Sequence, residues 1–191
     1  GGGTLVAFNS GTGPGTVLID GATVRGGTVV TDLADRASLV TFSVNGGTLD
    51  GTTAPVTLAP GAQVLIGAGE TVSVSGTFDL ARAGGIGGTL EVAGNGYYGI
   101  AAEALLTGDV VLTGGGTLAL TDGSGLSTSA TGSQVVTAAA PGDTLDNAGD
   151  LIVGYGSLGA GSMLLSNAAS GTVLATGGLL RIDTGGNAVV N

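Results

Sequence analysis

Residue types that could do chemistry gather in two short stretches of this chain. The first is TDLADR, where Asp32 and Asp35 stand beside Arg36. Paired carboxylates serve as general acid and base in polysaccharide cleavage, and an arginine can assist them. A solvated turn with a local ion pair is the favoured alternative, because a chain without His, Cys or Lys has no Ser–His–Asp or Cys–His system. We therefore expect no catalytic residue.

The second stretch is GDTLDNAGD, which brings Asp143, Asp146, Asn147 and Asp150 close together in the sequence. Carboxylate and amide oxygens are the ligands that Ca²⁺ prefers. The EF-hand pattern is missing, however, and so is the glycine- and aspartate-rich nonapeptide of calcium-binding β-rolls. These four residues are thus the candidate calcium ligands, a polar turn is the favoured alternative, and no other cofactor is expected.

The charge balance excludes several classes of partner. The chain carries 14 acidic residues against 4 basic ones, which leaves a net charge of −10. Nucleic acids and anionic lipids require clustered Lys or Arg, so we expect neither as a partner. No apolar run approaches the ~20 residues of a membrane-spanning helix, so we expect no membrane insertion by this segment.

Glycine and short apolar bursts dominate the composition. The chain has 41 Gly, 42% hydrophobic residues and only 9% charged residues, which is too apolar for a disordered segment. Bursts of four to six residues such as TVLID, AQVLI and ETVSVS end at Gly, Asn, Asp or Pro, and each predicts a short strand. The stretch 100–106, IAAEALL, lacks glycine and is the one candidate for two helical turns.

An asparagine recurs at a fixed interval in the last third. Asn147, Asn167 and Asn187 are each followed by Ala, and the interval between the first two equals the interval between the last two. In a solenoid such residues lie above one another, and their side-chain amides can form a hydrogen-bonded ladder at one corner. In an alternative register Asn191 replaces Asn187, because VVN at 189–191 resembles LLSN at 164–167. Chance spacing of three turn residues is the remaining interpretation.

Internal repetition at this period is the signature of a solenoid. We predict an all-β parallel solenoid of roughly 20–24 residues per coil, in which residues 1–191 form one body that belongs to a longer chain. A β-sandwich is the alternative. The 3% aromatic content and the recurring Asn-Ala weigh against it. Because both ends of a solenoid expose unpaired strand edges, we expect self-association or neighbouring coils there.

Two further segments carry expectations. The adjacent Tyr97 and Tyr98 in NGYYGI would point to opposite sides of a strand, which makes the outward ring a candidate contact surface. A packing role is the favoured alternative. The Ser-, Thr- and Gly-rich stretch 121–134 is expected to loop out from the coils.

The second half of the chain, above all residues 144–191, resembles the repeats of very large secreted bacterial proteins of the autotransporter and filamentous-haemagglutinin-like class, and the first half resembles them in style only. In those repeats an Asn-Ala-Gly turn, a G-x-G-x-L-G stretch, an L-x-N turn, G-T-I-x-A and L-x-I-D-T-G follow in order. The corresponding positions here are 147–149, 154–159, 165–167, 171–175 and 180–185. The resemblance implies a right-handed parallel β-helix at the cell surface or in the extracellular matrix, where it serves adhesion or display.

The sequence therefore predicts a non-enzymatic, structural and adhesive solenoid segment of a secreted bacterial surface or matrix protein. Self-assembly into filaments or a lattice is part of this expectation, and a host surface or a polysaccharide is the expected partner. The alternative from another class is a polysaccharide-active β-helix enzyme, a lyase or a hydrolase. Carboxylates gathered in one groove would favour the enzyme, whereas acids scattered over turns would favour the structural interpretation.

Overall fold

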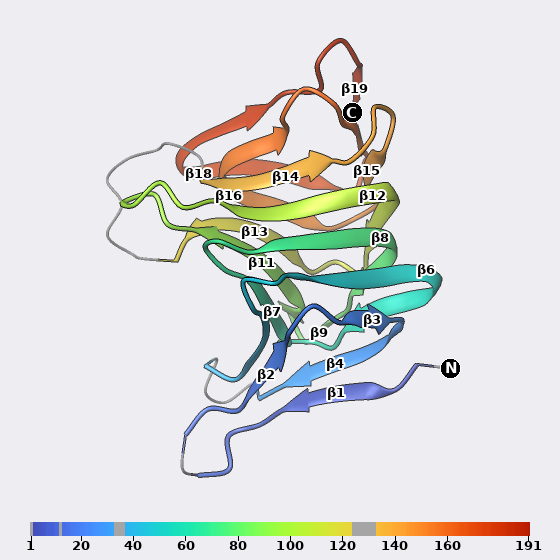
Figure 1. The fold of residues 1–191 in the computed structure, drawn as a ribbon. Coiled ribbons are helices and arrows are strands. Elements are labelled where there is room, and N and C mark those ends of the chain that lie inside the picture. Colours follow the sequence, from blue (N-terminus) through green and yellow to red (C-terminus); the bar gives the residue numbers. More distant parts are fainter. Residues whose placement is uncertain (1, 12, 33–36, 124–132) are drawn as a thin grey trace.

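The chain winds as a spiral of parallel strands. The computed structural model describes residues 2–11, 13–32, 37–123 and 133–191, in which 17 strands form one sheet. Figure 1 shows the strands stacked from β1 at one end of the body to β19 at the other. The strands fall into three sides, which we name A, B and C in the order in which the chain visits them.

Each side is a ladder of parallel pairs. Side A contains β1 (Thr4–Ala7), β4 (Gly27–Thr31), the second halves of β6 (Gly47–Leu58), β8 (Thr71–Leu80) and β12 (Ala102–Thr113), then β15 (Thr144–Asn147), β17 (Leu164–Asn167) and β19 (Val189–Val190). Side B contains β2 (Thr16–Ile19), β5 (Leu39–Phe42), β7 (Gln63–Ile66), β11 (Thr89–Gly94), β13 (Thr117–Asp122) and the first halves of β16 (Leu151–Gly159) and β18 (Thr172–Ile182). Side C contains β3 (Thr23–Arg25), the first halves of β6, β8 and β12, β14 (Gln134–Ala138) and the second halves of β16 and β18.

This topology confirms the parallel solenoid. A sandwich would be built from antiparallel sheets. In the described residues the antiparallel pairings are one small hairpin, β9 (Arg82–Ala83) with β10 (Ile86–Gly87), and two isolated bridges. The coils vary more in length than predicted. Thr144 pairs with Leu164 in the next coil, whereas Leu112 pairs with Asn147, so that coil is much longer. Longer coils place their extra residues in turns, so the ladders keep their register.

The core lies inside the three sides. Alternate residues of each strand point inward. Equivalent inward residues of successive coils lie above one another, and together they form apolar columns that run along the solenoid axis. The largest fully buried side chains are Phe42, Phe78, Leu49, Leu58, Ile66, Leu80, Leu106, Leu112, Leu120, Leu145, Ile152 and Leu158. Two of them are phenylalanine rings, and the others are aliphatic. In the described part of the chain, no helix is long and apolar enough to span a membrane.

Glycine makes some of the corners. In β16 the chain passes from side B to side C at Gly154 and Gly156, where the register of pairing with β18 shifts. Both residues have positive φ, 128° and 130°, and a Cβ at Gly154 would lie 1.9 Å from the Leu120 carbonyl oxygen. A side chain is thus excluded twice at Gly154, by its φ and by the coil beneath it.

The prediction of a helix at 100–106 is wrong. Ala102 to Leu106 belong to β12 and pair with β8 on one side and β14 on the other. Ala102, Ala104 and Leu106 alternate inward and are buried. Pairing on both edges and burial of every second residue outweigh the helix propensity of this segment, which is worth only about 0.5 kcal/mol per residue.

Removal of a core ring should destabilise the whole spiral. Phe78 is fully buried, so we expect Phe78→Ala to lower the free energy of unfolding by about 3–5 kcal/mol through lost burial and the cavity left behind. Ser73 lies on the same strand and points outward, so Ser73→Ala should change it by less than about 0.5 kcal/mol. Urea unfolding measures both, and equal losses would contradict the assigned inward face.

Candidate functional site

The best-defined polar feature is a ladder of asparagines at one corner of side A. The Asn147 Nδ2 donates to the Asn167 Oδ1 at 2.8 Å, and the Asn167 Nδ2 donates to the Asn191 Oδ1 at 2.8 Å. Asn147 is fully buried. A buried amide is costly unless it is hydrogen-bonded, and Asn147 finds one of its partners in the next coil.

The same amides also close the turn from side A to side B. The Asn147 Oδ1 accepts from the Asp150 N–H at 2.9 Å, and its Nδ2 donates to the Asp150 carbonyl oxygen at 3.0 Å. In the next coil the Asn167 Nδ2 donates to the Gly171 carbonyl oxygen at 3.3 Å. One side chain therefore fixes both the local turn and the spacing to its neighbour, which is a structural role.

Asn187 is not a member of the ladder, so that assignment is wrong. Val189 pairs with Leu165 and Val190 with Ser166, and this register places Asn191 beside Asn167. Asn187 lies in the preceding turn, where its carbonyl oxygen accepts from the Thr184 hydroxyl at 2.7 Å. The last coil therefore follows the alternative register, which ends at Asn191. A constant period fails because the turn lengths vary.

The ladder begins abruptly at Asn147. The residue beneath it is Leu112, and beneath that is Phe78. Both are buried apolar residues. The same corner is thus filled by hydrophobic contacts in the middle of the body and by amide hydrogen bonds in the last coils.

The four predicted calcium ligands do not converge. Leu145 and Asn147 are buried while Asp146 between them is not, so Asp146 and Asn147 point to opposite faces of the strand. The Asp143 carboxylate accepts from the Ala140 N–H at 3.0 Å, at the turn before the strand. Within the residues that the structure describes, no group of three or more acidic, His or Cys side chains could hold a metal ion.

Asp150 instead anchors the coil beneath it. It is 1% exposed, and its Oδ1 accepts from the Gly116 N–H at 2.7 Å. Burial raises the pKa of this carboxyl, hydrogen bonds from the Gly116 and Gly115 amides oppose the rise, and the nearby Asp79 charge adds to it. The Asp150 carboxylate thus accepts hydrogen bonds from backbone N–H groups of a glycine turn in the coil beneath. The cost is the loss of the carboxylate's own hydration.

Several other acids contact the neighbouring coil as well. The Glu103 carboxylate accepts from the Thr71 hydroxyl of one adjacent coil and the Thr137 hydroxyl of the other. Similar contacts join Asp20 to Ser43 and Asn45, Arg25 to Asp50, and Glu91 to Thr121. These acids are spread along the body. Sequence reasoning missed the pairs because their partners are 23–34 residues away.

The first candidate site falls largely outside the described residues. Asp35 and Arg36 lie beyond them, and so does most of the stretch 121–134 that the sequence predicts to loop out. Asp32 is described, and its N–H donates to the Ala7 carbonyl oxygen of the first coil at 3.1 Å.

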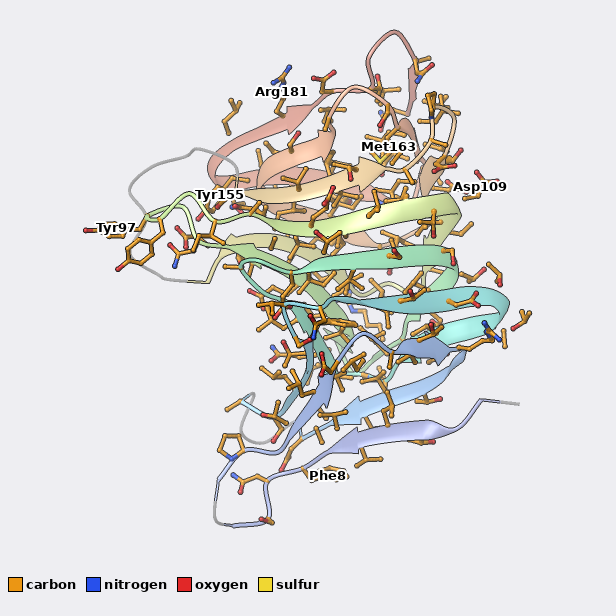
Figure 2. All side chains as sticks on the ribbon, in the orientation of Figure 1. Phe8, Tyr97, Asp109, Tyr155, Met163 and Arg181 are labelled. Atoms are coloured by element: carbon orange, nitrogen blue, oxygen red, sulfur yellow. The ribbon has the colours of Figure 1, made fainter. Side chains whose placement is uncertain are left out.

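The tyrosine prediction is wrong in its geometry. Both rings are exposed, Tyr97 by 69% and Tyr98 by 71%, and their centroids lie 4.8 Å apart in an edge-to-face arrangement. They lie in a turn that is closed by paired backbone hydrogen bonds between Asn95 and Ile100, so the alternation of a strand does not apply. Figure 2 shows Tyr97 projecting away from the body.

A surface hollow of about 280 Å³ lies between the β9–β10 hairpin and side B. Gln63, Thr89 and Thr117 line it from three successive coils, and Ile86 of the hairpin faces them. Amide and hydroxyl groups beside an exposed aliphatic side chain are suited to neutral polar ligands and supply no charge for acid–base chemistry.

The comparisons with known proteins add no identification. No family model, no curated protein and no solved structure matches this chain. The resemblance to secreted bacterial repeat proteins therefore stays a prediction.

Loss of a side-chain amide should lower the free energy of unfolding at a ladder position but not at Asn187. Asn167→Ala removes the acceptor of Asn147 and the donor to Asn191, so we expect the free energy of unfolding to fall by about 1–3 kcal/mol. Asn187→Ala is the matched control and should cost less than about 0.5 kcal/mol. Chemical denaturation distinguishes the two positions, and an equal loss at Asn187 would refute the register that ends at Asn191.

The buried Asp150 predicts a pH dependence of stability. Because its pKa is raised in the folded state, ionisation costs more there than in the unfolded chain. Its contribution is fully favourable below the usual Asp range and is lost as pH rises through the raised pKa, so the free energy of unfolding falls as pH rises above the usual Asp range.

Asp150→Asn keeps an oxygen that accepts from Gly116 and removes the ionisation. The difference in unfolding free energy between the two proteins should therefore shift in favour of the variant as pH rises above the usual Asp range. Thermal unfolding at a series of pH values measures it, and parallel pH profiles would show that Asp150 is not desolvated.

Proposed function

We propose that this chain is a structural and adhesive solenoid segment of a bacterial cell-surface or extracellular-matrix protein. Its role is to hold contact surfaces at a fixed separation along a stiff body. The proposal extends to export from the cell, which the resemblance to secreted repeat proteins implies.

The observation that carries the proposal is the way in which the acids are used. The described carboxylates Asp20, Asp50, Glu103 and Asp150 bind groups of a neighbouring coil. They are distributed along the body, whereas a glycoside hydrolase needs two carboxylates facing one bond, about 5–10 Å apart. An apolar core that continues from coil to coil supports the same role, because it gives a body without hinges.

The turn of Tyr97 and Tyr98 is the contact surface that we favour. Exposed tyrosines supply a large rigid area at little cost in conformational entropy, and they are enriched at binding hot spots. Among the residues that the structure describes, Tyr97 and Tyr98 form the one pair of aromatic rings in contact. A sugar polymer or a host protein surface fits such an edge-to-face pair.

Adhesion gives the direct test. Beads that carry the purified chain should bind to films of a neutral glucan, a polyuronate or a matrix protein, and Tyr97→Ser with Tyr98→Ser should weaken that binding by about tenfold or more. Val44, 80% exposed in another turn, offers the control Val44→Ser, which should leave binding unchanged. Equal binding by all three proteins would remove the tyrosine turn from the adhesive surface.

The same polymers separate the structural role from the enzymatic alternative. We expect no new reducing ends and no unsaturated sugar products after prolonged incubation with the chain. Cleavage that disappears in Asp32→Asn would overturn the proposal in favour of a polysaccharide-active enzyme.

A further inference from the structure

Two asparagines of this chain, Asn45 and Asn95, are followed directly by glycine. In such a pair the backbone nitrogen of the glycine can attack the side-chain carbonyl carbon of the asparagine, because glycine has no Cβ to obstruct the approach. Each pair lies in a turn that is closed by an isolated antiparallel bridge. The two pairs therefore have the same local chemistry, and they differ in how the surrounding structure holds the reacting groups.

The Asn45–Gly46 pair is held by hydrogen bonds at both reacting nitrogens. The Gly46 N–H donates to the Ser43 carbonyl oxygen at 2.8 Å, and the Asn45 Nδ2 donates to the Asp20 Oδ1 of the adjacent coil at 2.8 Å. Gly46 is also buried, and a Cβ there would lie 2.2 Å from the Thr71 carbonyl oxygen. Attack by the Gly46 nitrogen would have to break both hydrogen bonds and shift a backbone that has no space to move.

The Asn95–Gly96 pair is held at neither nitrogen. Within the residues that the structure describes, the Gly96 N–H and the Asn95 Nδ2 form no hydrogen bond, and the backbone of 96–99 forms none with another coil. Both residues are half-exposed, so water reaches them. The nitrogen that attacks and the nitrogen that leaves are therefore available without any bond being broken first.

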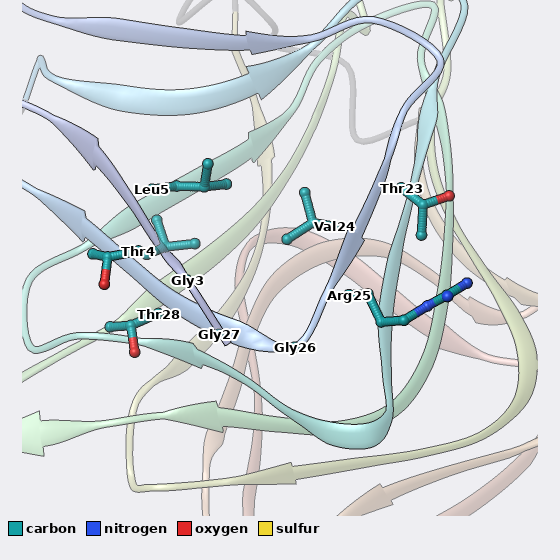
Figure 3. Close-up of a pocket in the computed structure, with 10 residues that line it drawn as sticks. Gly3, Thr4, Leu5, Thr23, Val24, Arg25, Gly26, Gly27 and Thr28 are labelled. Carbon is teal, nitrogen blue, oxygen red and sulfur yellow. The ribbon is translucent and has the colours of Figure 1, made fainter. Parts of the chain in front are cut away.

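Other turns of the body are tied to the coils beside them. Figure 3 shows the turn at Gly26, which joins β3 to β4, with Gly3 of β1's own end lying against it. The Gly26 N–H donates to the Asp50 carbonyl oxygen of one adjacent coil at 2.8 Å, and the Thr28 N–H donates to the Gly3 carbonyl oxygen at 3.0 Å. The turn of the two tyrosines lacks such ties, so its backbone can rearrange without displacing a neighbouring coil.

The tyrosine turn also activates the carbon that is attacked. The Tyr98 N–H donates to the Asn95 Oδ1 at 3.2 Å. Negative charge develops on this oxygen when the amide carbon becomes tetrahedral, and a backbone N–H that already points at such an oxygen stabilises that charge. The turn thus leaves the nucleophile unbound and assists the electrophile.

We propose that Asn95 is a site of spontaneous deamidation and that Asn45 is protected from the same reaction. The Gly96 nitrogen forms a bond to the Asn95 Cγ, the bond from Cγ to Nδ2 breaks, and ammonia leaves with the proton that Gly96 gives up. Water from the solvent then opens the cyclic imide at one of its two carbonyls. The product is aspartate or isoaspartate, and no oxidant or cofactor is needed.

Deamidation would change the surface that carries the tyrosines. Isoaspartate lengthens the backbone by one methylene group, so the two hydrogen bonds that pair Asn95 with Ile100 cannot both be kept. Either product places a negative charge beside the rings of Tyr97 and Tyr98. Adhesion through this turn should therefore weaken as the chain ages, a consequence that rests on the proposed function, whereas the reaction itself does not.

Peptide mapping by mass spectrometry tests the modification. In the folded chain at neutral pH, aspartate and isoaspartate should accumulate at position 95 about tenfold or more faster than at position 45, where two hydrogen bonds must break first. In concentrated urea the two rates should approach each other. Gly96→Ala adds a Cβ to the attacking residue, so it should slow the reaction at Asn95 and leave the rate at Asn45 unchanged.

Three results would overturn the proposal. Equal rates at the two asparagines of the folded chain would show that the turns do not control the reaction, and so would a difference that persists unchanged in urea. Aspartate without isoaspartate at position 95 would show direct hydrolysis of the amide without the cyclic imide.

The bead assay on aged chain keeps this proposal distinct from the proposed function, because the rates measured by mass spectrometry decide the modification whatever the beads do. Chain that carries isoaspartate at position 95 should bind polymer films more weakly than fresh chain. Undiminished binding after deamidation would remove the tyrosine turn from the adhesive surface. Fresh chain that binds no film would overturn the adhesive role alone.

Discussion

The constraint on which the structure depends is the spacing of about 4.8 Å between stacked parallel strands. At that spacing each residue lies directly above its equivalent in the coil beneath. Each side chain must therefore pack against, or hydrogen-bond with, the equivalent side chains of the adjacent coils. Aliphatic residues satisfy this inside the body, and the Asn147–Asn167–Asn191 ladder satisfies it with amides at one corner. Where a coil turns sharply, as at Gly154, the backbone beneath leaves no space for a Cβ.

The same constraint explains how polar groups are satisfied. An acid on one coil meets a hydroxyl, an amide or a backbone N–H of the next, as Glu103 meets Thr137 and Asp150 meets Gly116. Such contacts are long-range in sequence and local in space. They bind coil to coil, which makes the charged residues part of the stacking and leaves few of them to gather into a reactive cluster.

Strand-forming bursts, the parallel solenoid and the Asn147–Asn167 step could be predicted from the sequence, because they depend on local alternation and on one short period. The position of Asn191 could not be fixed, since the length of each turn is set by how its loop packs. Sequence reasoning assigns Tyr97 and Tyr98 to a strand although Asn95-Gly96 is a turn-forming pair, because the closure of the turn between Asn95 and Ile100 is a tertiary feature. Segment 100–106 looks helical because pairing on both edges cannot be read from the segment itself.

Stacking of the coils in the stated register is the central claim, and a distance between spin labels tests it most directly. The chain has no cysteine, so Leu18→Cys and Val153→Cys give two unique sites that point outward from one column of side B. Five strand pairings separate them, which predicts a narrow distribution near about 24 Å in pulsed electron paramagnetic resonance. A broad distribution, or a distance well away from this value, would contradict the stacked solenoid.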